Sequence, residues 1–251
     1  MTETRFERYA PLAGVGYFVL GIIGSGLAEP DPGFAPTSDK VVAYFTAHKD
    51  AVMASRTVYL VSMVLLLWFV SSLRSRLRQA EGGQGRLAEL AFAGGIAGFT
   101  LSIASAAVAM IGALRIDQVH AIDPQVATVL WDLSAILFSL AAPTAFAALV
   151  LPSAALSLRT GVLPRWLGAI SVALGAALLL PPISHVAIIL FTFWVAVVAT
   201  ALVVRVDPQS SSPAVAVASF AGASPCATLH LGGGRVVTDA PVDDSRQWPQ
   251  T

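Results

Sequence analysis

The chain has 251 residues, of which 56% are hydrophobic and only 12% are charged. A soluble domain carries about 25% charged residues, so this composition excludes an ordinary water-soluble globule. The formal net charge is zero, which excludes a general electrostatic attraction to nucleic acid. The single cysteine, Cys226, excludes an internal disulfide and a cysteine-based metal centre.

The apolar residues fall into six long blocks, and this pattern predicts an all-α, polytopic membrane protein. A helix of about 20 apolar residues, rising about 1.5 Å per residue, crosses a hydrocarbon core of about 30 Å. The blocks have about this length or exceed it. The predicted transmembrane domain, residues 11–205, is therefore a bundle of six helices at about 11–28, 51–73, 87–114, 125–151, 163–180 and 184–204.

Residues that start and end helices support several of these boundaries. Asp123 followed by Pro124 is typical of an N-cap with proline at the first helical position. The two prolines at 181–182 are expected to end the fifth helix, and Ser184 is expected to cap the sixth. Pro143, inside the fourth block, predicts a kink because proline has no backbone N–H.

The basic residues predict that both termini are cytoplasmic, because positively charged loops remain on the cytoplasmic side of a membrane. The loops assigned to the outer side contain only Lys40, Lys49 and Arg115. The cytoplasmic side includes the N-terminus, residues 1–10, and holds the other basic loop residues. These are Arg5, Arg8, Arg74, Arg76, Arg78, Arg86, Arg159, Arg165, Arg205, Arg235 and Arg246.

The first apolar block allows a second interpretation. Arg5 and Arg8 precede it and small residues end it before Glu29, a pattern that is also typical of a cleaved signal peptide. The length of the block and the acidic Glu3 and Glu7 argue for a retained helix, but the sequence leaves both alternatives open.

A proline-rich segment after the first block leads into a short amphipathic helix that begins at Ser38. Val41, Val42 and Phe45 share one face of this helix. We expect it to lie on the outer membrane surface or to cap the bundle.

From Asp207 onward the composition changes to serine, proline, alanine and glycine, as in PQSSSPAVAVASFAGASP. Such a composition predicts a disordered cytoplasmic tail over residues 207–251. Cys226 lies in this tail and is interpreted as an ordinary free thiol.

One carboxylate interrupts the fourth block, at Asp132 in VLWDLSAILFSLAA. Arg56 lies at a similar distance from the outer end of the second block. A charge inside a membrane costs free energy, so we expect Asp132 and Arg56 to form an ion pair. Tyr59 lies one turn below Arg56, and His185 begins the sixth helix at the same side. This group either fixes the packing of the helices or forms a ligand-binding site in an outward-facing cleft.

Two other arrangements of polar residues have weaker support. Asp117, His120 and Asp123 are spaced by three and could form a metal site with His48 or His185, but no recognised ligand spacing is present. We therefore predict no metal site.

Ser25 and His185 resemble the dyad of an intramembrane serine protease, which also needs a base within reach and an oxyanion hole. Ser25 has a simpler explanation as part of a pair of small residues four apart, which lets helices approach closely. Such pairs are Gly21 and Ser25, Gly94 and Gly98, and Ser171 and Gly175.

Three segments together resemble a known family. A proline-rich loop leads into SDKVVAYFTAH at 38–48, the second block ends in LRSRLR at 73–78, and a later block begins GVLPRWLGAISVALG at 161–175. Over residues 8–205 the chain is similar to a family of uncharacterised six-span bacterial integral membrane proteins, a domain of unknown function. The resemblance implies the six-span fold and brings no substrate, cofactor or catalytic residue.

The sequence thus predicts an integral protein of a bacterial inner, or plasma, membrane, with both termini inside and the lipid bilayer around it. The function that fits best is the binding or movement of a small ligand through an outward-facing cleft, without enzymatic activity or a cofactor. An accessory subunit that contacts another membrane protein or a second copy of itself is the alternative. An intramembrane enzyme is the third interpretation.

Overall fold

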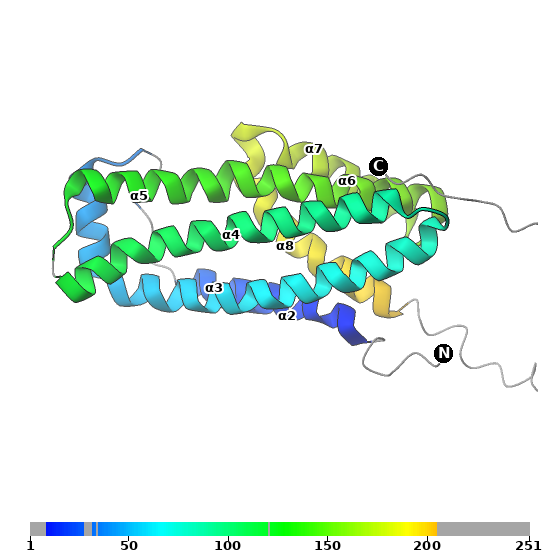
Figure 1. Ribbon diagram of the computed structural model, residues 1–251, viewed down its shortest axis with the longest axis horizontal. Coiled ribbons are helices and arrows are strands. Elements are labelled where there is room, and N and C mark those ends of the chain that lie inside the picture. Colours follow the sequence, from blue (N-terminus) through cyan, green and yellow to red (C-terminus); the bar gives the residue numbers. More distant parts are fainter. Residues whose placement is uncertain (1–8, 28–31, 34, 120, 205–251) are drawn as a thin grey trace, which may run out of the picture. The chain divides into compact units, whose positions relative to one another are not determined.

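The computed structural model describes residues 9–27, 32–33, 35–119 and 121–204, and all of them are helical or lie in short connections between helices (Figure 1). The chain divides into two units, Met1–Ser210 and Ser211–Thr251, and the described residues belong to the first. The predicted tail, 207–251, lies outside them. The elements are η1 (Ala10–Leu12), α2 (Ala13–Leu27), α3 (Ser38–Glu81), α4 (Arg86–Val119), α5 (Pro124–Ile136), η2 (Leu137–Ala141), α6 (Ala142–Thr160), α7 (Arg165–Leu178) and α8 (Pro181–Val204).

Five segments of the described chain are helical, long and apolar enough to cross a membrane. They are Ala10–Leu27, Ser38–Glu81, Arg86–Val119, Pro124–Thr160 and Ile183–Val204. This helical unit therefore has the build of a multi-pass membrane protein, and the predicted all-α class is confirmed for the described residues.

The fifth predicted span is shorter than its apolar block. α7 has 14 residues and is about 21 Å long, which is less than a hydrocarbon core of about 30 Å. Pro164 lies just before its first residue, and the next helix already begins at Pro181. Proline therefore limits this helix at both ends, and the count of six spans stays a prediction.

Small residues bring the neighbouring helices α4 and α6 into close contact. A Cβ atom on Gly94 would lie 2.5 Å from the carbonyl carbon of Ala148, and one on Gly98 would lie 2.5 Å from the ring of Phe146. Since hydrogen is the only side chain that fits there, the predicted packing role of this glycine pair is confirmed.

The other two small-residue pairs had different outcomes. Ser171 is buried, and a Cβ atom on Gly175 would lie 2.5 Å from Leu151, so this pair also packs tightly. The pair on α2 does not, because a Cβ atom on Gly21 would meet nothing within 4 Å and Ser25 is exposed. That prediction was wrong.

Three helical rods extend beyond the shorter helices. α3 has 44 residues, α4 has 34, and α5 continues through η2 into α6 over residues 124–160. At one end these rods share a separate hydrophobic cluster of buried residues. Its members are Val41, Phe45, Val52, Ala113, Ile116, Ile122 and Ala127. We call this end, formed by the first residues of α3, the last of α4 and the first of α5, the distal end.

The amphipathic segment that begins at Ser38 is the first part of α3. It is joined to the rest of the helix across a kink at His48, whose φ and ψ angles are −123° and 21°. In Figure 1 this first part of α3 turns across the end of the other rods. Val41 and Phe45 are buried in the distal cluster, so of the two positions expected for this segment the structure shows the one that caps the bundle.

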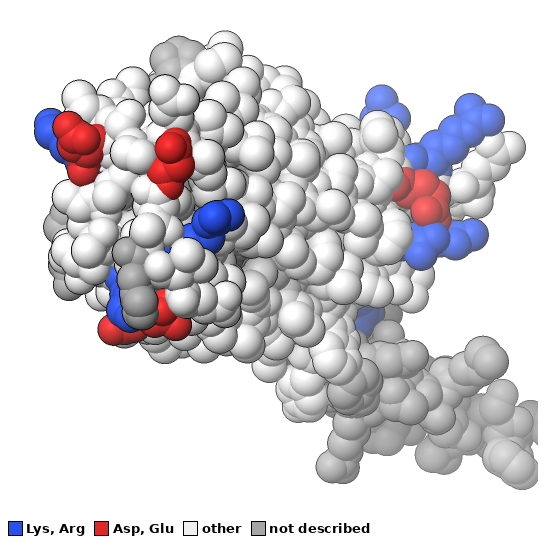
Figure 2. Space-filling model, turned by 60° about the vertical axis from the view of Figure 1, so that its left-hand side comes forward, with Lys and Arg blue, Asp and Glu red and all other residues white. Residues whose placement is uncertain are grey.

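Charged side chains lie at the two ends of the helical unit, and on the face in Figure 2 an uncharged belt separates them. On α3 the belt extends from Arg56 to Arg74, with no charged residue between them. This distance is 18 residue steps, or about 27 Å. The belt therefore matches the thickness of a hydrocarbon core of about 30 Å.

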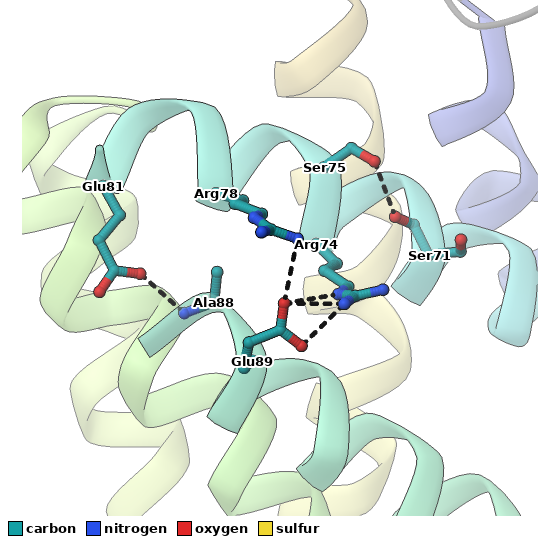
Figure 3. Close-up of polar contacts among 7 residues, drawn as sticks. All are labelled: Ser71, Arg74, Ser75, Arg78, Glu81, Ala88 and Glu89. Atoms are coloured by element: carbon teal, nitrogen blue, oxygen red, sulfur yellow. Dashed lines mark hydrogen bonds and ion pairs between the residues drawn. The ribbon is translucent and has the colours of Figure 1, made fainter. Parts of the chain in front are cut away.

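The end opposite the distal end is held together by charged groups, and we call it the basic end (Figure 3). Arg74 of α3 donates three hydrogen bonds to Glu89 of α4, at 2.8–3.2 Å, and its guanidinium lies 4.6 Å from the ring centre of Phe92. The Glu81 carboxylate accepts hydrogen bonds from the N–H groups of Leu87 at 3.0 Å and Ala88 at 2.9 Å. The same bonds hold the pKa of Glu81 below its usual value of 4.5.

Two predicted helix caps had opposite outcomes. The Asp123 carboxylate accepts hydrogen bonds from the N–H groups of Gln125 and Val126, at 2.9 and 3.2 Å, so this cap is confirmed. Ser184 does not cap the last helix, because α8 already begins at Pro181 and Ser184 lies within its first turn. Proline has no N–H group that would need a partner at the first helical position. The helix therefore begins at Pro181, three residues earlier than expected.

Candidate functional site

Arg56 lies between two cavities at the distal edge of the uncharged belt. It is half-buried on α3 and lines both. The first cavity has a volume of about 210 Å³ and the second about 370 Å³. The first is lined by Gly33, Phe45, Arg56, Ser105, Ala109, Trp131, Ser134, Ala135, Phe138, Ser139 and His185. Arg56 and Phe138 are the residues that line both.

Aromatic rings and hydroxyl groups surround Arg56 in the first cavity. The ring centres of Phe45 and Trp131 are 6.1 Å apart, and those of Phe138 and His185 are 6.2 Å apart. These residues come from α3, α5, η2 and α8, and Ser105 and Ala109 of α4 also line the cavity, so it lies where five elements meet. Aromatic faces and a cation together suit a ligand that has an apolar part and a negative charge.

A pair of buried serines fixes the floor of the first cavity. The hydroxyl of Ser105 donates to the carbonyl oxygen of Ser134 at 2.9 Å, and the hydroxyl of Ser134 donates to the carbonyl oxygen of Ser105 at 3.1 Å. The two hydroxyl oxygens are 3.3 Å apart. Interhelical hydrogen bonds of this kind each contribute about 0.6 kcal/mol in a membrane protein. They hold α4 and α5 together beside Arg56.

A π-helical turn, η2, directs the chain from α5 into α6 beside both cavities. Pro143 follows it and has no N–H to donate to the carbonyl oxygen of Ser139, four residues earlier. The hydroxyl of Ser184 on α8 donates to that oxygen at 2.5 Å. The kink predicted at Pro143 is therefore a π turn, and the carbonyl group of Ser139 binds the neighbouring helix α8. Turns of this kind are frequent at functional sites.

The guanidinium of Arg56 makes no hydrogen bond and no ion pair with any residue that the structure describes. Other basic side chains do have such partners, among them Arg74 with Glu89, and Lys49 with Asp117 at 2.6 Å. A guanidinium group has five N–H donors in a fixed planar geometry that matches carboxylate and phosphate groups. The donors of Arg56 are thus available to a ligand in either cavity.

Asp132 does not pair with Arg56 in this structure. Within the described chain no ion pair joins them, and Asp132 is among the residues of neither cavity lining. It is exposed on the outer face of α5, as are Val129, Leu133 and Ile136. Trp131 and Ser134 occupy the opposite, inner face. The ion pair expected from the sequence is therefore not formed.

The other two residues of the predicted group do border the cavities. Tyr59 lines the second cavity, where its ring centre is 6.3 Å from that of Phe138, and His185 lines the first. The structure thus brings Arg56 close to Tyr59 on one side and to His185 on the other. A ligand-binding role for these residues stays a prediction.

The protease and metal interpretations receive no structural support. Ser25 lines the second cavity, whereas His185 lines the first, and the Ser25 hydroxyl donates to the carbonyl oxygen of Ile22 on its own helix at 2.8 Å. Asp117 bonds Lys49 and Asp123 caps α5. His120 lies outside the described residues, and the described ones contain no group of three metal-ligating side chains.

Several residues of the site were not predicted from the sequence. Trp131, Ser134 and Phe138 are spaced by three and four, so they share one face of a helix, and all three line the first cavity. This spacing in WDLSAILF was the available signal. Ser105 had no such signal, since its partner lies 29 residues away in the chain.

A comparison of the chain with protein-family models, curated proteins and solved structures finds no match to any of them. The resemblance to a bacterial six-span family therefore stays a prediction, and the proposed function depends on the geometry of the site.

Proposed function

We propose that this protein is a six-span protein of the bacterial inner membrane, with both termini in the cytoplasm, that binds a small anionic ligand in a cleft open to the outer side. The basic end, with Arg74, Arg76, Arg78, Arg86 and Arg159, supports a cytoplasmic position for that end. The distal end, and with it the cleft, then faces outward. The protein moves or senses its ligand and carries out no covalent chemistry.

The observation that carries this proposal is Arg56, a cation that two cavities share and that has no acidic partner among the described residues. A cation at the centre of a membrane costs about 3 kcal/mol of free energy. The cost is smaller at the edge of the hydrocarbon core, where Arg56 lies. Ionisable residues inside membranes mark ligand and ion pathways. A ligand with negative charge would provide the missing partner.

The experiment measures whether small anions stabilise the protein in nanodiscs made of zwitterionic lipid. A ligand that binds only the folded state raises the free energy of unfolding, by about 2.7 kcal/mol at a concentration of 100 times its Kd. The probes are acetate, inorganic phosphate and sulfate. We expect stabilisation by at least one of them in the wild type, less in Arg56→Lys and none in Arg56→Gln.

Asp132→Asn is the matched control, because it removes a charge at a similar depth that borders neither cavity. It is expected to respond to anions as the wild type does. If Arg56→Gln were stabilised as much as the wild type, the proposal would be refuted.

The accessory-subunit alternative has one observation in its favour. Asp132 is exposed on α5 beside the exposed apolar side chains of Val129, Leu133 and Ile136, where another helix with a basic or hydroxyl group could pack. If this face is an interface, Asp132→Leu will change the mass of the complex that is purified in mild detergent. An unchanged mass would remove the support for this alternative.

A further inference from the structure

The second cavity is a groove lined mostly by apolar residues of α2, α3 and α8. Its floor is formed by the buried residues Tyr17, Phe146 and Ile188. At its mouth lie Ile22 and Ile189, which are 51% and 54% exposed. Both belong to the charge-free helices α2 and α8, whose exposed apolar faces would contact lipid. The groove is thus accessible from the hydrocarbon side.

Gly21 leaves space in this groove, and the aromatic pair of Phe18 and Phe193 lies at its end toward the basic end. A Cβ atom on Gly21 would meet nothing within 4 Å, so the space next to it is empty. Further toward the basic end, Phe18 of α2 contacts Phe193 of α8, with ring centres 4.8 Å apart. The groove therefore extends from Arg56 into the belt and is narrowed by this pair.

Arg56 connects the apolar groove to the polar first cavity, because it lines both together with Phe138. A ligand that lies across this point would place a negative head group at the guanidinium and an apolar chain along the groove. We propose that the ligand is a single-chain amphipathic anion, whose head group binds Arg56 and whose chain lies between α2 and α8. This inference rests on the proposed function and specifies its ligand class.

The geometry favours such a ligand over a fully hydrated anion. A small inorganic anion would use Arg56 but leave the groove of about 370 Å³ unfilled. Each methylene group that passes from water into an apolar site strengthens binding, measured against the ligand in water, about fourfold. A chain of several methylene groups in the groove therefore increases affinity far beyond that of its head group alone.

The experiment measures binding to nanodisc-embedded protein by scintillation proximity, with the signal of empty nanodiscs subtracted. The probes are labelled dodecyl phosphate, inorganic phosphate and the neutral dodecyl maltoside. We expect dodecyl phosphate to bind at least a hundredfold more tightly than the other two. Arg56→Gln is expected to weaken dodecyl phosphate binding at least tenfold.

A matched pair of glycine substitutions tests the position of the chain. Gly21→Leu fills the groove, whereas Gly26→Leu places the same side chain on the same helix outside both cavities, and a Cβ atom meets nothing within 4 Å at either site. Gly21→Leu should weaken the binding of dodecyl phosphate at least tenfold and leave the binding of inorganic phosphate unchanged. Gly26→Leu should bind as the wild type does.

The outcomes separate this inference from the proposed function. If inorganic phosphate binds as tightly as dodecyl phosphate and Gly21→Leu has no effect, the chain site is refuted while anion binding at Arg56 stands. If Arg56→Gln changes the binding of neither probe, both the chain site and anion binding at Arg56 are refuted. If bound dodecyl phosphate is displaced when phosphatidylglycerol is added to the nanodisc, the ligand is a two-chain bilayer lipid and the single-chain assignment is refuted. If it is retained, the anion is a free single-chain amphiphile.

Discussion

Replacement of Gly94 by alanine should push two helices apart at the centre of the bundle. The new Cβ atom would lie 2.5 Å from the carbonyl carbon of Ala148 and 2.6 Å from the backbone nitrogen of Leu149. Carbon atoms pack best at about 3.5–4.0 Å, so α4 and α6 must separate by about 1 Å. The obstacle is backbone, which cannot move aside as a side chain does.

The expected magnitude combines two opposing effects. Overpacking of a tight interface costs about 1–3 kcal/mol, and a collision with backbone belongs at the upper end of that range. Alanine is favoured over glycine in a helix by about 1 kcal/mol, which offsets part of the cost. We therefore expect Gly94→Ala to lower the free energy of unfolding by about 2 kcal/mol.

Gly21→Ala is the control, since its new methyl group meets nothing within 4 Å. Only the helix-propensity gain applies there, so this variant should be up to about 1 kcal/mol more stable than the wild type. The assay is unfolding by sodium dodecyl sulfate in mixed micelles with dodecyl maltoside, followed by circular dichroism. If Gly94→Ala proved as stable as Gly21→Ala, the close approach of α4 and α6 would be wrong.

Three further predictions concern the serine pair, the basic end and the orientation. Ser105→Ala removes one of two reciprocal hydrogen bonds and should lower stability by about 0.6 kcal/mol in the same unfolding assay, whereas the equivalent change at an exposed serine should have no effect. The folded-state pKa of Glu81 is lowered, so the carboxylate stabilises the fold above its unfolded pKa, and this stability is lost as the pH falls through the folded pKa. Between pH 6 and pH 3 the free energy of unfolding should therefore fall more steeply in the wild type than in Glu81→Gln. Parallel pH profiles of the two proteins would contradict this role of Glu81. In a Cys226→Ser background, a membrane-impermeant maleimide should label Gln118→Cys in intact cells and label Gln84→Cys only after permeabilisation, and the reverse pattern would overturn the proposed orientation.

The sequence was sufficient to predict the helical membrane class, the amphipathic helix that begins at Ser38 and the tight glycine pair on α4. These features depend on local composition and spacing, which the sequence contains directly. The length of α7 was not predicted, because apolar composition continues through the residues where proline and the next helix limit it. Helix length depends there on packing and connections and not on hydrophobicity.

The site was predicted only in part. Arg56, Tyr59 and His185 were predicted as members of one polar group near the outer side, and all three border a cavity. Asp132 was matched to Arg56 by depth, but it lies on the other face of α5. Depth follows from a count of residues along a helix, whereas the face depends on how that helix is rotated against its neighbours. The rotation of α5 is set by Trp131 and its contacts with distant parts of the chain.

The position of Arg56 would make the proposed anion-binding cleft sensitive to hydrophobic mismatch. About 27 Å separate Arg56 from Arg74 along α3, and this length is rigid because both residues belong to one continuous helix. In a thicker bilayer the guanidinium is drawn below the head-group region, so the membrane must thin locally or the helix must tilt less. In a thinner bilayer Arg56 moves into water, where its attraction for an anion weakens. Lipid composition would thus tune the affinity of the cleft without a second binding site, through the thickness of the membrane alone.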